Sequence, residues 1–446
     1  MRNSQMRRDP RTARLIARRT RQMASAAPVF IAALAIVMTS ACRDITRLQQ
    51  SNPGQLGPEV FSPENADLIV NSAHGDFECA FNEYVVASGL FVDELANAIS
   101  FIESYDLDRR TITADSPYGT ADCTFQQTPG VYTPLSVARA SNDTAVAHLE
   151  GWTDEQVPDR SKLIGEASAY AGYSLVLLGE SMCSAALNLG PELTPAQLFA
   201  EAQTRFDTAI AAATRSSDEQ TLNFALLGRA RTELDLGNSA AAATDAALIP
   251  SGFEVDIDHD ATATRRQNLV WVHTQLAQLS SVDTSIQNRY ARSVAVDSPD
   301  ARIAVTSTGA LGSDGFTVVV YPNKDSVATA KQAVAKYAEA QLIIAENDAN
   351  IGQFNAAVTI LNALRTAAGQ PAYAGALTKP AVMADVVEQR RRSLFLEGHR
   401  LGDIRRLGLP ISPAAGAPYV AGGSYTDQSC FPLPNVERIN NPNIGG

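Results

Sequence analysis

Two short segments of the chain share one pattern, and this internal similarity restricts the possible folds more than any other feature. Residues 236–242 and 351–357 each contain an apolar residue, a Gly, an amide, two further residues and a pair of Ala. Around the first segment, Phe224, Leu227 and Gly228 occupy the bulky, Leu and Gly positions of a tetratricopeptide repeat. A single helical hairpin cannot bury its apolar face alone, so such hairpins stack on one another.

Helix-boundary signals support the same arrangement. Residues 194–197 form a capping box with Pro at the first helical position, and residues 217–220 are a second helix start that leads to Gly237. The sequence therefore predicts a mainly all-α fold with helical hairpins at about residues 161–250 and 326–408. An alanine-rich bundle without true repeats is the alternative, and it is equally helical.

Two regions interrupt the helical pattern. Residues 100–155 and 251–325 are rich in Thr, Ser, Asp, Gly and Pro, with only short strand-like runs such as residues 316–321. Long irregular insertions on a repeat scaffold usually carry recognition. We therefore expect these two insertions to be loop-rich and to bind the ligand.

The first 41 residues resemble an export signal. Eight Arg precede an apolar run at residues 29–38, which is too short to span a hydrocarbon core of about 30 Å. Small residues at 39–41 lie directly before Cys42, as in a lipobox, so we expect Cys42 to be acylated and to anchor the protein to a membrane. Ordinary cleavage, with Cys42 free or disulfide-bonded, is the alternative.

The charge of the remaining chain argues against polyanionic partners. The whole sequence has 36 basic and 48 acidic residues. Removal of the first 41 residues, which hold eight Arg and one Asp, leaves 28 basic and 47 acidic residues, a net charge of −19. Because phosphates would be repelled, nucleic acid and anionic lipid are poor candidate ligands.

Export changes the interpretation of the cysteines. Besides Cys42, an even number remains, and none lies in a CxxC pair typical of zinc or redox sites. Three pairings are possible. We favour Cys79 with Cys123 and Cys183 with Cys430, because the second bridge would tie the C-terminal tail to a helix. Four buried free thiols are the alternative.

A search for catalytic motifs finds none. The chain has no HExxH, no phosphate loop, no GxSxG elbow and no GxGxxG after a strand. Its five His are scattered, and residues 256–260 resemble a calcium loop in which Ala261 and Gln267 replace the required Gly and Glu. A solvated acidic turn is the favoured interpretation there. We therefore expect no enzyme activity, no metal and no cofactor.

The most informative stretch is residues 388–408. It combines several Arg with carboxylates three residues away, an arrangement that brings opposite charges together on a helix. The pairs are Glu397 with Arg400 and Asp403 with Arg406. Gly398 weakens such a helix and suggests that another backbone passes close to it. A basic patch for an anionic ligand is the alternative.

This stretch closely resembles the C-terminal hallmark of the SusD/RagB family of outer-membrane nutrient-binding lipoproteins. The resemblance covers nearly the whole mature chain in family order. Its further elements are Cys42 followed by residues 51–53, the tetratricopeptide-like hairpins, the helix at 361–365 before Gly369, and a tail from 431–434 to 441–443.

The resemblance implies one SusD-like domain over residues 42–446, lipid-anchored and exposed at the cell surface. Such a protein captures an oligosaccharide, or in some relatives a peptide, and acts as a lid on a SusC-like TonB-dependent transporter without being an enzyme. Family members commonly stack sugars on aromatic rings. The residues that we expect to contact the ligand on this basis are Trp152, Trp271, Tyr290 and Tyr321.

Two other classes of function remain open. A tetratricopeptide-like envelope scaffold would bind protein partners only. A secreted hydrolase would need two loop carboxylates at a functional separation, and nothing in the sequence selects such a pair.

Overall fold

The computed structural model describes residues 60–124 and 127–444, so the predicted export signal and Cys42 lie outside the described residues. Residues 61 onward form one compact unit. The fold is mainly helical, which confirms the predicted class. No helix among the described residues is both long enough and apolar enough to span a membrane.

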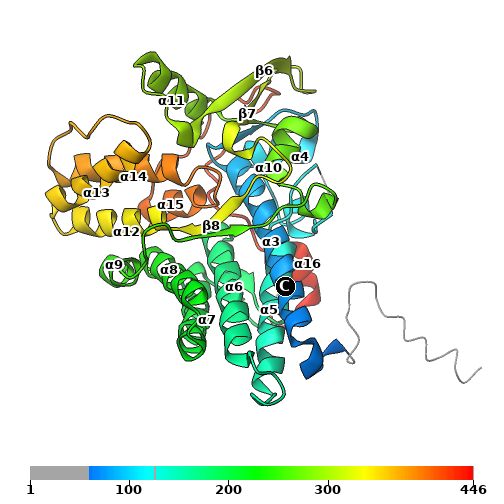
Figure 1. The fold of residues 1–446 in the computed structure, drawn as a ribbon. Coiled ribbons are helices and arrows are strands. Elements are labelled where there is room, and N and C mark those ends of the chain that lie inside the picture. Colours follow the sequence, from blue (N-terminus) through cyan, green and yellow to red (C-terminus); the bar gives the residue numbers. More distant parts are fainter. Residues whose placement is uncertain (1–59, 125–126, 445–446) are drawn as a thin grey trace, which may run out of the picture. The chain divides into compact units, whose positions relative to one another are not determined.

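The first half of the fold is a row of packed helices (Figure 1). They are α3 (Ala66–Phe91), α5 (Tyr132–Glu150), α6 (Arg160–Ser181), α7 (Pro195–Ser216), α8 (Glu219–Asp235) and α9 (Ser239–Ala246). The predicted capping box opens α7, where Thr194 and Gln197 cap each other's backbone, and Asp218 caps α8. Each helix in the row packs against the next one.

Small residues allow these helices to pack closely, as the repeat pattern predicts. A Cβ atom added to Gly172 on α6 would lie 2.7 Å from the Phe206 ring, and one added to Gly228 on α8 would lie 2.4 Å from it. The Phe206 ring of α7 therefore occupies the space that two glycines leave on the neighbouring helices. A larger residue at either position would force the hairpins apart.

A second group of helices continues the row from α9. It comprises α12 (Tyr337–Asn350), α13 (Phe354–Ala367), α14 (Lys379–Ser393) and α15 (Arg400–Leu407), with α16 (Asn435–Asn440) in the tail. The equivalent glycines of the internal repeat, Gly237 and Gly352, both have φ of +83° just after a helix, as a C-terminal helix cap requires. The second set of predicted hairpins, expected from about residue 326, begins later, because residues 332–336 form a strand and α12 starts at Tyr337.

Within the described residues, the strands form four short antiparallel pairs. These are β1 (Leu95–Asn97) with β5 (Ser280–Val282), β2 (Ala185–Ala186) with β3 (Glu192–Leu193), β4 (Glu254–Ile257) with β8 (Gln332–Lys336), and β6 (Val305–Leu311) with β7 (Val318–Pro322). Shorter helical elements are α4 (Ile102–Asp108), α10 (Leu269–Trp271), the π-helix η5 (Val272–Leu276) and α11 (Thr284–Ala295). The 3₁₀ turns are η2 (Pro63–Asn65), η3 (Pro117–Gly119), η4 (Thr264–Arg266), η6 (Ala301–Ile303) and η7 (Asn323–Asp325).

The two predicted insertions contain more helix than their composition indicates. α5 lies inside residues 100–155 and α11 inside residues 251–325. In α5 the Ser, Thr and Asp side chains lie mainly on one face, while Leu135, Ala138 and Leu149 are buried on the other. Polar composition alone misled the prediction, because a half-buried helix needs only one apolar stripe.

The pairing of cysteines is the one that the sequence favours. Cys79 on α3 is bonded to Cys123, and Cys183 after α6 is bonded to Cys430 in the tail. Next to the second bridge, Phe431 donates its backbone N–H to Ser181 O, and Cys183 donates its own to Phe431 O. The C-terminal tail is thereby fixed to the end of α6.

Candidate functional site

The segment 388–408, which the sequence singles out, is not one continuous helix. α14 ends at Ser393 and α15 begins at Arg400, and between them Leu396 and Gly398 have positive φ. Leu396 donates its backbone N–H to the buried carboxylate of Glu94, which fixes the turn. A Cβ atom on Gly398 would lie 3.0 Å from the Tyr84 ring, so a side chain, not the expected backbone, passes close there.

The charged side chains of this segment are paired inside the protein. Asp403 binds Arg406 at 2.7 Å as predicted, and it also binds Arg390 at 2.8 Å. The predicted pair of Glu397 with Arg400 is wrong, because the turn separates the two side chains. Glu397 instead binds Lys336 at 2.6 Å, and Arg400 binds Asp93 at 2.8 Å.

The charges in these pairs stabilise one another, which indicates that the segment has a structural role. Burial opposes the ionisation of Asp403, but Arg390 and Arg406 outweigh it and hold its pKa well below the ordinary value. Burial likewise opposes ionisation of Glu397, and Lys324 and Lys336 lower its pKa nevertheless. Because these cations already have partners, the segment offers no basic patch for an anionic ligand.

The two predicted insertions meet elsewhere, beside β1 and β7. Ser100 Oγ donates a hydrogen bond to Ser313 O at 3.0 Å, and Asp314 N donates one to Ala98 O at 3.2 Å. Gly312 is required at this contact, because an added Cβ would lie 2.1 Å from Ala98 O. The start of the first insertion, through the Ser100 side chain and the backbone of the preceding Ala98, is thus joined to the loop between β6 and β7 (top of Figure 1).

The chain segments that flank these hydrogen bonds carry several exposed apolar side chains, which together we call the junction face. Its members are the exposed large apolar residues of the two joined segments: Phe101, Ile102, Leu311, Phe316 and Val318. Phe101 is 36% exposed and Phe316 is 58% exposed. Soluble proteins rarely leave such groups together on the surface unless they bind something.

The junction face is held by rigid backbone. Asp314 Oδ1 accepts hydrogen bonds from the backbone N–H groups of Phe316 and Thr317, both at 3.0 Å. On the adjacent strand, Ser281 Oγ accepts from Val320 N and donates to Val318 O, which ties β7 to β5. The Phe316 ring is therefore exposed on a loop that is fixed at both of its ends.

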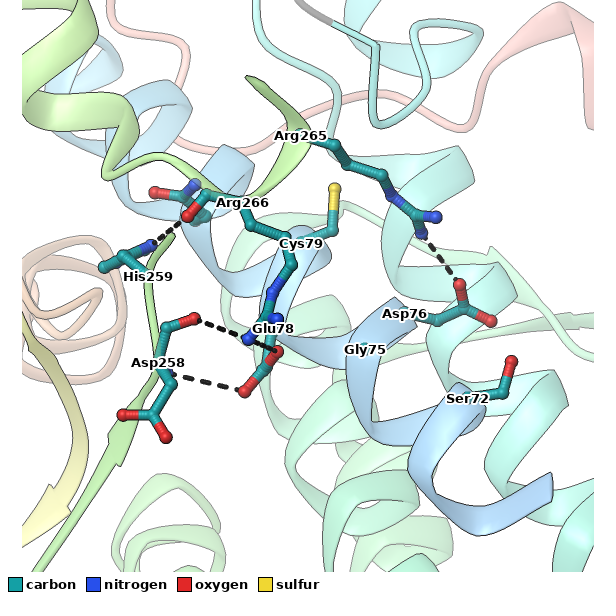
Figure 2. Close-up of a pocket in the computed structure, with 10 residues that line it drawn as sticks. Ser72, Gly75, Asp76, Glu78, Cys79, Asp258, His259, Arg265 and Arg266 are labelled. Carbon is teal, nitrogen blue, oxygen red and sulfur yellow. Dashed lines mark hydrogen bonds and ion pairs between the residues drawn. The ribbon is translucent and has the colours of Figure 1, made fainter. Parts of the chain in front are cut away.

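A second candidate is a polar cavity between α3 and residues 258–266 of the second insertion (Figure 2). Its volume is about 240 Å³. Two ion pairs cross from the loop to the helix: Arg265 binds Asp76 at 2.9 Å, and Arg266 lies 3.7 Å from Glu78. Both guanidinium groups are about half exposed. The side chains that line the cavity include both carboxylates and guanidinium groups, but no aromatic ring except that of His259.

Burial shifts the pKa values of two side chains that line this cavity, Glu78 and His259. Burial raises the pKa of Glu78, although the backbone N–H of Asp258 and the charge of Arg266 partly offset the effect. Burial also lowers the pKa of His259 to about 4, so the ring is neutral at pH 7. Its Nδ1 atom lies 3.2 Å from Arg266 O. This cavity suits polar hydroxyl groups better than a strongly charged ligand.

The four aromatic residues predicted to contact a ligand are not brought together. Trp152 packs in a separate apolar cluster, and its ring centroid lies 6.0 Å from that of His148 with 29° between the ring planes. Trp271 and Tyr290 pack against the main core, and Tyr321 is half-buried on β7 opposite Thr306. Among the described residues, no aromatic contact joins any two of the four. The rings that are exposed where the insertions meet, Phe101 and Phe316, were not selected from the sequence.

The acidic stretch at 256–260 and the scattered His do not converge on a metal. In the described part of the chain, no group of His, Cys, Asp and Glu is arranged to hold one. Asp256 binds Lys331 at 3.4 Å, and Asp260 accepts hydrogen bonds from Thr262 within its own turn. These carboxylates therefore stabilise the loop, as in a solvated acidic turn.

Comparison with known proteins decides the family. Residues 197–435, more than half of the chain, match the sequence model of the SusD family. The chain belongs to the SusD family. No curated protein sequence matches this SusD-family chain.

Solved structures of other SusD proteins have the same fold. A SusD superfamily protein from Bacteroides vulgatus aligns with a TM-score of 0.68 at 16% identity, over 86% of this chain and 100% of that chain. A SusD-like carbohydrate binding protein from the same species aligns at 0.64 and 13% identity, over 86% and 97%. Surface glycan-binding protein A from Bacteroides uniformis aligns at 0.65 and 14% identity, over 86% and 98%. At these identities the likeness shows the fold alone.

Proposed function

We propose that this SusD-family protein captures an oligosaccharide at the cell surface and delivers it to a SusC-like TonB-dependent transporter, for which it acts as a lid. In this proposal Cys42 carries the lipid anchor at the outer membrane. The protein binds its ligand without converting it. Membership of the family and the names of two relatives, a carbohydrate binding protein and a surface glycan-binding protein, support the proposal.

The single observation that carries the binding site is the junction face. It lies where the two insertions of the helical scaffold are hydrogen-bonded to each other, and it exposes two phenyl rings. The apolar C–H face of a pyranose ring packs flat against an aromatic ring, because both surfaces are apolar and aromatic side chains offer a large apolar area. Two rings on a fixed loop and its partner segment can each hold one sugar unit.

Polar groups close to the rings supply hydrogen bonds to sugar hydroxyls. Ser100 lies between Ala98 and Phe101 and is itself exposed, and residues 307–310 of β6 are exposed as well. Tyr321 lies on the same hairpin as Phe316, and η5, which follows Trp271, packs against β7. We propose Tyr321 and Trp271 as outer contacts, while Trp152 and Tyr290 belong to this site only if the ligand is long.

The test is a mild-detergent purification of the tagged, full-length protein from its own outer membrane. Mass spectrometry should find a TonB-dependent transporter in near-equal amount. The Phe101→Ala/Phe316→Ala double variant is a matched control, which should still recover the transporter because it alters only the ligand site. Recovery of other envelope proteins without any such barrel would contradict the lid and favour a protein-binding scaffold.

A further inference from the structure

Each of the two phenyl rings on the junction face has an acidic residue two positions away in the chain. Glu103 follows Phe101, and Asp314 precedes Phe316. The Cα atoms of residues two positions apart are separated by at most about 7 Å. This separation is close to the Debye length of about 8 Å at physiological ionic strength, so salt only partly screens these charges at the rings.

Neither of these carboxylates is neutralised by a cation. Asp314 accepts its hydrogen bonds from neutral donors, the backbone N–H groups of Phe316 and Thr317 and the hydroxyl group of Thr317 at 2.6 Å. The Oε2 atom of Glu103 has no hydrogen-bond partner. In the described part of the chain, no Lys, Arg or His lies within ion-pair distance of either carboxylate.

The chain segments around the junction face contain no basic residue. These segments carry β1 with α4, β5, the β6–β7 hairpin, and the loop that donates Thr426 N to Arg109 O at the end of α4. They are residues 92–108, 276–288, 303–323 and 412–428, and none of them includes a Lys, Arg or His. Burial lowers the pKa of His273, 3.3 Å from Ser280 on β5, to about 4, so this ring is neutral at pH 7.

The two basic residues that follow α4 already have partners. Arg109 binds Asp106 at 2.6 Å. Arg110 is only 1% exposed and donates to Thr426 O at 3.0 Å. Neither guanidinium group is therefore available to an anionic group bound on the phenyl rings.

The basic residues that flank the β6–β7 hairpin lie at its other end. Lys324 and Arg302 adjoin the end where Val305 pairs with Pro322, and they bind Glu397 at 2.9 Å and Asp300 at 2.7 Å. Arg292 lies on α11, which packs against η6 at the same end. The length of β6, about 20 Å, separates this end from the turn that carries Phe316.

This distribution of charge discriminates between classes of sugar. An uncharged pyranose packs on the phenyl rings without any electrostatic cost. A carboxylate or sulfate group at the same place would be repelled by Glu103 or Asp314, and like charges across an interface suppress binding of the wrong partner. No guanidinium group is free there to bind such an anion in the usual bidentate way.

We propose that the junction face selects uncharged oligosaccharides and rejects those that carry uronate or sulfate groups. The inference rests on the proposed glycan-binding function and narrows it to one class of substrate. The phenyl rings supply the affinity, and the carboxylates of Glu103 and Asp314 supply the discrimination.

The test is a glycan array that carries neutral oligosaccharides beside uronate-containing and sulfated ones, followed by titration with a matched set. The set consists of the best-retained hexose oligosaccharide, the uronate made by oxidation of its primary hydroxyl groups, and the methyl ester of that uronate. We expect the uronate to bind at least about tenfold more weakly than its ester, because only the uronate is charged. Higher salt should narrow this difference.

A variant and its control assign the discrimination to the junction face. Glu103→Gln should reduce the ratio of ester affinity to uronate affinity about threefold, because one of the two repelling charges is removed. Glu150→Gln should leave the ratio unchanged. Glu150 ends α5 next to Leu149, which packs with Ala66 at the start of α3, whereas β1 follows the end of α3.

The outcomes separate this inference from the function on which it rests. Equal binding of the uronate and its ester by the wild-type protein, or retention of mainly acidic glycans on the array, would overturn the selection and leave glycan capture intact. Retention of no glycan would contradict the proposed function itself, and the inference with it. The contrast between uronate and ester is measured on the wild-type protein, so it needs no variant to fold.

Discussion

Around residues 388–408, charged side chains are buried and paired, whereas on the junction face apolar side chains are exposed to solvent. Asp403 lies between two guanidinium groups inside the protein, while the Phe316 ring is 58% exposed on a loop. Each arrangement reverses the usual distribution of polar and apolar groups. The first stabilises the connection between the helical row and the strands, and the second is available for a ligand.

The comparison predicts that charge removal near α15 destabilises the protein strongly. Asp403→Ala should lower the free energy of unfolding by about 3–5 kcal/mol, because it leaves the buried Arg390 without its carboxylate. Urea unfolding measures the loss. Asp207→Ala, which removes an exposed carboxylate paired with Arg229, is the control and should cost no more than about 1 kcal/mol. Equal losses of unfolding free energy in the two variants would contradict the distinction between buried and exposed charge pairs.

The disulfide that fixes the tail should have the next largest effect. Replacing both Cys183 and Cys430 by Ser should cost about 2–5 kcal/mol, because the bond closes a long loop, with a sequence separation of 247 between its cysteines. Thermal unfolding in the absence of reductant measures the change. Glycan affinity should be unchanged at temperatures where the variant is folded, since this bond involves no residue of the junction face. A loss of affinity in the folded variant would show that the tail takes part in binding.

Carboxyl groups whose pKa is raised by burial predict a pH dependence opposite in sign to that of Asp403, whose pKa is lowered. Burial raises the pKa of Glu83 to about 8 and that of Asp108 to about 7. The folded state therefore holds protons that the unfolded state has lost, so these groups stabilise the fold at low pH and the benefit disappears as pH rises from about 4 to 8. Glu83→Gln should flatten the upper part of this decline in unfolding experiments. An unchanged slope would show that Glu83 titrates normally.

The polar cavity of Figure 2 should give the smallest effect on stability. Arg265→Ala removes a half-exposed ion pair with Asp76 and should cost less than about 1 kcal/mol in urea unfolding. The same variant also distinguishes between the two candidate glycan sites, which are the polar cavity and the junction face. If it abolishes glycan binding while Phe101→Ala does not, the ligand binds in the cavity and not on the junction face.

The sequence predicts the scaffold well because its signals are local. The capping box at Thr194 and the paired glycines Gly237 and Gly352 each act within one helix turn or hairpin. Predictions that needed tertiary contacts were less successful. The turn at 394–399 depends on Glu94, about 300 residues away in the chain, which accepts from Leu396 N.

The candidate ligand site was predictable only in part. Both insertions were selected from composition, and the structure joins them through Ser100 and Asp314. The aromatic residues were chosen by type; Trp271 and Tyr290 are partly buried against the core, and their contact with a ligand stays a prediction. Phe316 follows a Gly-Ser-Asp-Gly turn, which is a signal of exposure, but nothing local in the sequence indicates that Ser100, next to Phe101, bonds to the same turn.

The most direct test of glycan binding by the junction face is a glycan-array measurement on the wild-type protein and the Phe101→Ala/Phe316→Ala variant. We expect the wild-type protein to retain at least one class of oligosaccharide. The variant should lose about tenfold or more in affinity for it, with a free energy of unfolding within about 0.5 kcal/mol of wild type. Undiminished binding by the variant, or retention of peptides and no glycan by the wild-type protein, would contradict this role of the junction face.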